Sequence, residues 1–378
     1  MNKSFGNFKL KIKYMRFTAL GLLLVFQITI TSQKFTISGN IKDAENGEDL
    51  IGASIHEKDK KDIGTISNIY GYYSLSLEKG EYTIIFNYIG YEQIELDIII
   101  RKDIKKNIEL TTNNQLLSEI EISTNSENQN ITKNEMSITR IDPKNIETIP
   151  VLFGEKDILK TLQLNPGIKA AGEGNSGFYV RGGGIDQNLI ILDEAPVYNS
   201  SHLLGFFSVF NSDAIKDATL YKGGIPAEFG GRGSSVLDVK MKEGNNKKLT
   251  AKGGIGLISS RLTIEAPIVK NKGSFLISGR RSYADIFAQI SKDTVVNQST
   301  LYFYDLNLKS NYQINDKNRI YLSGYFGRDN FKLSDQFSFD WGNTTFTLRW
   351  NHLFNDQLFS NTSIIYSKYS YAFNVGDE

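Results

Sequence analysis

The chain has 378 residues, too many for one ordinary hydrophobic core, which predicts two or three domains. Its 43 Lys and Arg residues balance 42 Asp and Glu residues, so the net charge of +1 gives no reason to expect nucleic acid as a partner. The lack of cysteine excludes disulfides and thiolate sites, and 19 Tyr, 23 Phe and 33 Gly with only 6 Pro favour β-strands over helices.

The chain begins with a pattern typical of an export signal. A basic run at residues 9–16 precedes an apolar stretch at residues 17–30 and a small residue, Ser32. This order predicts a secretory signal peptide over residues 1–32, cleaved before Gln33. The alternative is a membrane anchor, but about 14 apolar residues fall short of the ~20 that a helix needs to cross a bilayer.

Residues 33–110 alternate apolar and polar side chains with a period of two. Phe35, Ile37 and Ile41 form one apolar set, and turn residues separate it from the next runs. This spacing predicts a small all-β sandwich. The stretch contains no acid pair, histidine cluster or nucleophile arrangement, so we expect it to have a structural or docking role.

Residues 111–130 are polar and predict a linker, because they cannot bury enough apolar surface to fold alone. One short strand pattern lies within it, formed by Glu119, Ile120, Glu121, Ile122 and Ser123. Such a segment can add as a strand to the sheet edge of another protein. It can equally be the last strand of the preceding sandwich.

Residues 131–244 predict a small mixed α/β unit with glycine-rich connections. Apolar residues at helical spacing predict one helix over residues 157–164 and a second over residues 212–220. Short strands are expected at residues 178–180, 189–192, 218–221 and 236–241.

Three glycines, residues 182–184, precede an apolar run that ends in Asp193 and Glu194, as in a phosphate loop followed by a magnesium-binding acid. A phosphate loop needs Gly-Lys-Ser or Gly-Lys-Thr, and neither occurs in the chain. The pattern excludes a dinucleotide-binding fold as well, because the glycines lead into a strand pattern and not into a helix. Asp193 and Glu194 are therefore predicted to form a turn at a strand end, and we expect no metal and no cofactor.

Residues 245–378 contain longer alternating strands, in which apolar Leu306 and Leu308 follow polar Asp305 and Asn307. Segments of about 9 to 11 residues suit outer-membrane β-barrel strands, apolar toward lipid and polar toward the lumen. A soluble sandwich has the same period, but the export signal and the strand length favour the barrel. Only about eight strands fit, so either a small barrel closes or, as we favour, the chain is a fragment of a larger one.

The order of these segments resembles the N-terminal part of a TonB-dependent outer-membrane receptor: signal peptide, carboxypeptidase-regulatory-like sandwich, energy-coupling box, plug domain and partial barrel. The matching motifs lie at residues 39–43, 51–55, 68–73, 89–92, 117–123, 162–167, 179–183, 186–188, 192–197, 214–216, 220–224, 227–232 and 280–283. Glu194 departs from the pattern, because glycine is common at its position. The barrel is also incomplete, which puts transport by this chain alone in doubt.

The resemblance implies a mainly β outer-membrane receptor for energised nutrient uptake, and not an enzyme, with the sandwich in the periplasm. Its implied partners are outer-membrane lipid, a nutrient ligand (siderophore, cobalamin, glycan or peptide) and the TonB protein of the inner-membrane energising complex. The segment at residues 119–123 would pair with TonB. The alternative is a secreted or surface-exposed β-rich adhesin or binding protein without transport activity.

Two groups of plug residues are further candidates under this resemblance. Charged contacts with the barrel wall are assigned to Arg181, Glu228 and Arg232, with ordinary solvated turn charges as the alternative. A plug loop could meet substrate, with a structural loop core as the alternative; its candidate residues are Tyr198, His202, Phe206 and Phe207.

Overall fold

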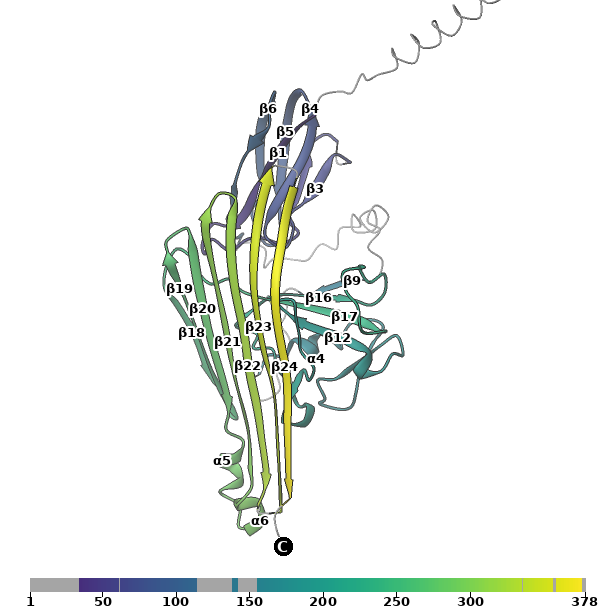
Figure 1. Cartoon of the computed structure of the whole chain (residues 1–378), viewed down its shortest axis with the longest axis vertical. Coiled ribbons are helices and arrows are strands. Elements are labelled where there is room, and N and C mark those ends of the chain that lie inside the picture. The colour runs from purple at the N-terminus through teal and green to yellow at the C-terminus, as the bar shows by residue number, and fades with distance from the viewer. Residues whose placement is uncertain are drawn as a thin grey trace, which may run out of the picture.

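The computed structural model describes residues 34–60, 62–113, 138–141, 155–334, 336–355 and 358–375. The predicted signal peptide and the strand segment at residues 119–123 lie outside these ranges. The described part is mainly β, as predicted, and consists of a sandwich, a plug and a long antiparallel sheet that we call the wall (Figure 1).

The sandwich consists of two sheets of short strands. Alternate apolar side chains such as Ile37, Ile41 and Ile55 are fully buried between them, which confirms the predicted period of two. The first sheet joins β4 (Tyr72–Glu78), β1 (Lys34–Asp43), β7 (Ile104–Lys105) and β8 (Ile108–Leu110). The second has the order β3 (Gly64–Ile66), β2 (Ser54–Glu57), β5 (Gly80–Asn87) and β6 (Ile94–Ile100).

The plug is built around a five-stranded mixed sheet. Its order is β13 (Ala195–Pro196), β12 (Asn188–Leu192), β17 (Ser235–Met241), β16 (Ile215–Tyr221) and β9 (Ile138–Ile141). Two small hairpins join β10 (Ile168–Ala170) to β11 (Phe178–Val180) and β14 (Ser201–His202) to β15 (Phe207–Ser208). Two 3₁₀ turns, η1 (Ile185–Gln187) and η2 (Leu203–Gly205), complete the unit.

One of the two predicted plug helices is confirmed and the other is wrong. Helix α4 (Ile158–Leu162) begins after Asp157, whose carboxylate accepts hydrogen bonds from two backbone N–H groups of the first turn. Residues 215–221 form strand β16 instead of a helix. Because β16 lies between β17 and β9, Ala218, Thr219 and Leu220 are all buried, and such a strand loses the alternation that distinguishes it from a helix.

The wall is a seven-stranded antiparallel sheet in chain order. Its strands are β18 (Thr250–Ile255), β19 (Ser259–Val269), β20 (Gly273–Ser282), β21 (Thr300–Asn315), β22 (Asn318–Leu333), β23 (Phe337–Asn355) and β24 (Leu358–Val375). Two short helices, α5 (Asp285–Ala288) and α6 (Thr294–Asn297), connect β20 to β21 at the end far from the sandwich (Figure 1). None of the helices in the described ranges combines the length and the hydropathy needed to cross a membrane.

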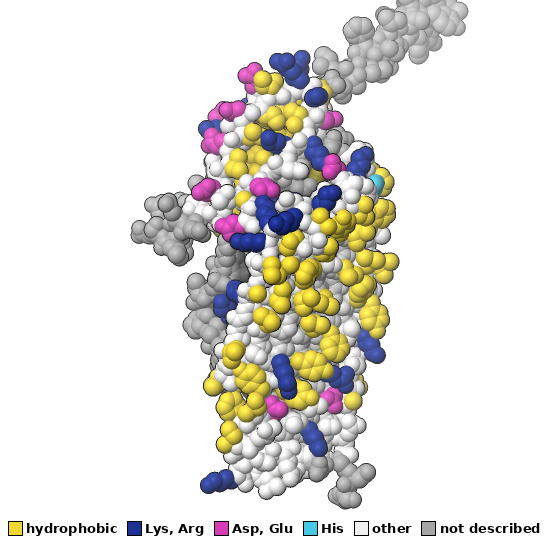
Figure 2. All heavy atoms as spheres, turned by 90° about the vertical axis from the view of Figure 1, so that its left-hand side faces the viewer, with side chains coloured by type: hydrophobic (Ala, Val, Ile, Leu, Met, Phe, Trp, Pro, Cys, Tyr) yellow, Lys and Arg dark blue, Asp and Glu magenta, His cyan; other side chains and the backbone are white. Residues whose placement is uncertain are grey.

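The two faces of the wall differ as the alternation predicts. Leu306 and Leu308 are exposed on the outer face, whereas Asp305, Asn307 and Lys309 are buried on the inner face. Figure 2 shows a broad band of apolar side chains on the outer face, below the charged surface of the sandwich. The plug packs on the inner face, and this arrangement places the polar side chains of the wall strands against plug residues.

Candidate functional site

Sandwich, plug and wall meet at a buried cluster of charges centred on Arg319 of β22. Its guanidinium forms ion pairs with Asp49 of the sandwich and with Glu243 of the plug, the latter at 3.0 Å. It also donates to the amide oxygen of Asn311 on the neighbouring wall strand, at 2.8 Å. The side chain of Arg319 therefore links the wall to both the sandwich and the plug.

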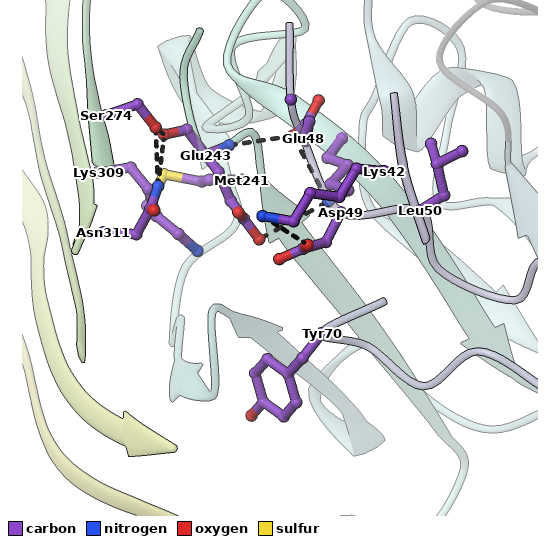
Figure 3. A network of polar contacts seen from close by, with 12 residues as sticks. Lys42, Glu48, Asp49, Leu50, Tyr70, Met241, Glu243, Ser274, Lys309 and Asn311 are labelled. Atoms are coloured by element: carbon purple, nitrogen blue, oxygen red, sulfur yellow. Dashed lines mark hydrogen bonds and ion pairs between the residues drawn. The ribbon is translucent and has the colours of Figure 1, made fainter. Parts of the chain in front are cut away.

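Glu243 is the plug residue at the centre of this cluster. It follows the end of β17, and its backbone oxygen accepts hydrogen bonds from Ser274 (2.7 Å) and Asn311 (3.1 Å) of the wall. Its backbone N–H donates to Glu48 of the sandwich at 3.0 Å, while Lys216 of β16 lies 3.6 Å from Glu48. Figure 3 shows Glu48 and Asp49 beside Glu243 at this junction.

The electrostatics of the cluster favour its charged form. Burial would raise the pKa of Glu243, but the positive charges of Lys216 and Arg319 outweigh burial and lower this pKa to about 2. Burial likewise opposes the charge on Lys216, and the carboxylates of Glu48 and Glu243 raise its pKa above the ordinary value. Each charged group in the junction therefore keeps its charge because groups of opposite charge lie beside it.

We expect the stability contributed by Glu243 to disappear in acid. Its folded pKa of about 2 lies below the ordinary 4.5, so its contribution is present above pH 4.5 and is lost as the pH falls through about 2. The measurement is denaturant unfolding of the parent chain and of Glu243→Gln from neutral pH downward. The difference in unfolding free energy should shrink below pH 4.5, and a difference that stays constant would contradict this assignment.

A second group of charges holds the plug sheet against the wall. Asp193 and Glu194 have φ angles of +47° and +76° and form the two-residue turn between β12 and β13, which confirms the predicted strand-end turn. Asp193 binds Lys309 at 2.6 Å and Glu194 binds Arg349 at 3.0 Å. Burial would raise the pKa of Asp193, but Lys309 and Arg349 outweigh it and hold this pKa below the ordinary value.

The predicted substrate loop divides into buried and exposed residues. His202 is buried, and its ring stacks on Phe303. The carboxylate of Asp329 on the wall accepts a 2.6 Å hydrogen bond from Nδ1 of His202. Phe207 packs against Phe303 in a small buried apolar cluster. For these two the structure supports the alternative, a structural loop core, whereas Tyr198 and Phe206 are 58% and 52% exposed.

The predicted plug contacts Arg181, Glu228 and Arg232 are exposed in the structure. The plug–wall ion pairs described above involve other residues, and these three assignments stay predictions. The wall partners Lys309, Arg319 and Arg349 do occupy the polar positions of alternating strands. That pattern signals which face they lie on, but nothing in the sequence indicates their partners.

Two family comparisons agree with this architecture. The profile of the CarboxypepD_reg-like domain matches residues 37–122, and that of the TonB-dependent receptor plug domain matches residues 130–236. Together the two matches cover more than half of the chain. The chain belongs to the TonB-dependent receptor family. This family consists of outer-membrane receptors and not of enzymes, as the sequence predicts.

Solved structures of similar fold are themselves receptors, but longer than this one. The siderophore receptor PirA from Pseudomonas aeruginosa aligns over 64% of this chain and 42% of its own, with 14% identity and a TM-score of 0.47. The alcaligin outer membrane receptor FauA from Bordetella pertussis aligns over 64% and 40%, with 13% identity and a TM-score of 0.47. This receptor chain thus spans about two fifths of the length of those proteins. No curated protein sequence matches it.

Proposed function

We propose that this receptor takes part in energised uptake of a nutrient across the outer membrane. The observation that carries the proposal is the plug itself, which buried ion pairs hold on the polar inner face of an outer-membrane wall. A plug held in this way closes a lumen until its contacts are broken. The energy to break them would come from TonB, bound to the segment at residues 119–123.

The chain connectivity suggests how a pull on that segment would act. The segment lies between the sandwich, described up to residue 113, and β9, which begins at Ile138. In the described part, β9 is the outermost strand of the plug sheet and pairs with β16 over four residues. Tension would therefore reach a four-residue ladder at the edge of the plug sheet on one side and the docked sandwich on the other.

The nutrient belongs to one of the classes that the family resemblance allows: siderophore, cobalamin, glycan or peptide. Tyr198 and Phe206 are the exposed aromatic residues of the loop proposed to meet it. Arg181, Glu228 and Arg232 are proposed to contact further parts of a complete barrel.

We expect Ile120→Pro to weaken binding of a purified TonB C-terminal domain more than about tenfold, because proline removes a ladder donor and disfavours strand addition. The measurement is titration calorimetry with the full receptor chain in detergent. The matched control is Asn128→Pro, which places proline in the same linker outside the strand pattern. Equal binding by the parent chain and Ile120→Pro would rule out this segment as the TonB site.

A further inference from the structure

The plug hairpin of β14 and β15 is attached to the wall through one histidine. Nδ1 of His202 lies 2.6 Å from the carboxylate of Asp329 on β22, and Nε2 lies 3.3 Å from the carboxylate of Asp305 on β21. A neutral imidazole carries a hydrogen on only one of its nitrogens, and an ionised carboxylate accepts hydrogen bonds but does not donate them. The ring can therefore donate to both carboxylates only when it is doubly protonated and positively charged.

A neutral ring has a different partner within reach. The hydroxyl of Tyr325 lies 3.3 Å from Nε2 of His202, and a hydroxyl can donate to an unprotonated ring nitrogen. Loss of the hydrogen from Nε2 would thus replace the ion pair with Asp305 by a neutral hydrogen bond to Tyr325. The site contains a partner for each protonation state, but only the charged state binds both wall carboxylates.

The balance of charge around the ring depends on its proton. Arg280 of β20 binds the carboxylate of Asp305 at 2.7 Å and that of Glu155 in the plug at 3.3 Å. With the ring charged, His202 and Arg280 together face the three carboxylates of Asp305, Asp329 and Glu155. Without that proton, one guanidinium would face all three. The charged groups that border this network through Glu155, Phe207 or Ser208 include Asp157, Lys160, Arg261 and Asp213.

Burial and neighbouring charge act in opposite directions on His202. Burial opposes the charged ring, but the carboxylates of Asp329 and Asp305 outweigh burial and raise the pKa of His202 above the ordinary 6.5. A group whose pKa is raised in the folded state contributes stability below its ordinary pKa and loses this contribution as the pH rises through the folded value. The contact of the hairpin with the wall should therefore be strong in acid and weaker in alkali.

The turn that follows His202 depends on the same wall contact. Leu203 and Leu204 have φ angles of +48° and +57°, in the left-handed region where a leucine is strained. The backbone N–H of Leu203 donates to Asp329 at 2.8 Å, so the carboxylate that binds the ring also holds this strained backbone. A weaker contact between His202 and Asp329 would let the turn relax.

The β15 end of the hairpin is anchored independently of the histidine. The backbone N–H of Ser208 donates to Asp157 at 2.8 Å, and its carbonyl oxygen accepts a hydrogen bond from Arg280 at 2.8 Å. Neither contact involves the imidazole. A change in the protonation of His202 should therefore move residues 202–206 and leave Ser208 in place.

We propose that the turn at residues 202–206 is a proton-dependent latch between plug and wall, closed while both ring nitrogens of His202 carry a hydrogen and open when one is lost. Opening would move Phe206, which is 52% exposed and belongs to the loop proposed to meet the nutrient. The latch thus makes the shape of this loop depend on the surrounding pH. Its effect on the nutrient rests on the proposed uptake function, whereas the latch itself does not.

The protonation state of His202 is measured by ring-nitrogen NMR on the full chain in detergent, isotope-labelled at histidine. The chain has only three histidines, and His202→Gln identifies the signals of this ring. We expect the ring to be mostly doubly protonated at pH 6.5 and to titrate at a higher pH. Asp329→Asn, which removes the charge but keeps a side-chain oxygen, should lower the midpoint by about 1–3 pH units. A ring that is mostly neutral at pH 6.5, or an unchanged midpoint in Asp329→Asn, would overturn the proposal.

Movement of the turn is measured with a single nitroxide label. The chain has no cysteine, so Phe206→Cys creates one attachment site on the exposed turn. Electron paramagnetic resonance should show a mobile fraction that rises over the same pH range as the NMR titration. His202→Gln should abolish this pH dependence. The matched control is His352→Gln, which changes a histidine bonded to Asn318 on the neighbouring wall strand and should leave the pH dependence intact.

Three outcomes of the label experiment would contradict a latch at His202. They are a label that stays immobile through the titration, a pH dependence that survives His202→Gln, and a pH dependence that is lost in His352→Gln. Neither TonB nor nutrient is present in these assays, so failure of the latch and failure of the uptake proposal are distinguishable.

Discussion

Arg319→Ala is expected to release the sandwich from the plug and the wall. The substitution leaves the carboxylates of Asp49 and Glu243 in the junction without the guanidinium that binds both. Removing one partner from a buried ion pair typically costs ~3–5 kcal/mol when the remaining charge is uncompensated. Lys42 stays 3.6 Å from Asp49 and Lys216 stays 3.8 Å from Glu243, so we expect a cost at or below the lower end of that range. Asp49 is fully buried, so undocking of the sandwich is the simplest way for its carboxylate to regain water.

Hydrogen exchange of the backbone amides is a suitable measurement, because it reports local opening. In the docked state, the backbone N–H groups of Asn246 and Glu243 donate to Asn46 and Glu48 of the sandwich. We expect exchange at these two amides to speed up in Arg319→Ala, while amides within β1 and β4 stay protected. Arg328→Ala, on the same wall strand, is the matched control, and equal protection in both variants would show that Arg319 does not hold the junction.

The alternation of the wall strands was predictable because it is a local property. In any strand, successive side chains point to opposite faces, so Leu306 and Lys309 could be assigned to different faces without knowledge of the fold. The turn at Asp193 and Glu194 was also predictable, because an apolar run that ends in two polar residues is a local sequence pattern. Glu194 has φ of +76°, a conformation that glycine adopts freely, which accounts for the glycine common at this position in the family.

The partners of the charged side chains could not be predicted in this way. Asp49 and Arg319 are 270 positions apart in the chain, and their contact depends on how two separately folded units dock. His202 illustrates the same limit, because an isolated histidine beside aromatic residues suits either a ligand loop or a core. The contact of His202 with Asp329 on the wall, which favours a core role, depends on how the plug packs and could not be read from the sequence.

Lys309→Met is expected to lower the unfolding free energy of the receptor chain by ~3–5 kcal/mol, because it leaves the buried carboxylate of Asp193 without its cation. The measurement is denaturant unfolding in detergent. Lys368→Met, which removes an exposed lysine from β24, is the matched control and should have little effect.

A double substitution separates the charge effect from the loss of packing. Asp193→Asn combined with Lys309→Met removes both charges, and asparagine tolerates the left-handed backbone at position 193. If an uncompensated charge causes the loss, the double variant should be more stable than Lys309→Met alone, with a coupling free energy well above zero. Equal instability of the two variants would mean that the plug is held mainly by packing against the wall, and that breaking its ion pairs alone would not free it.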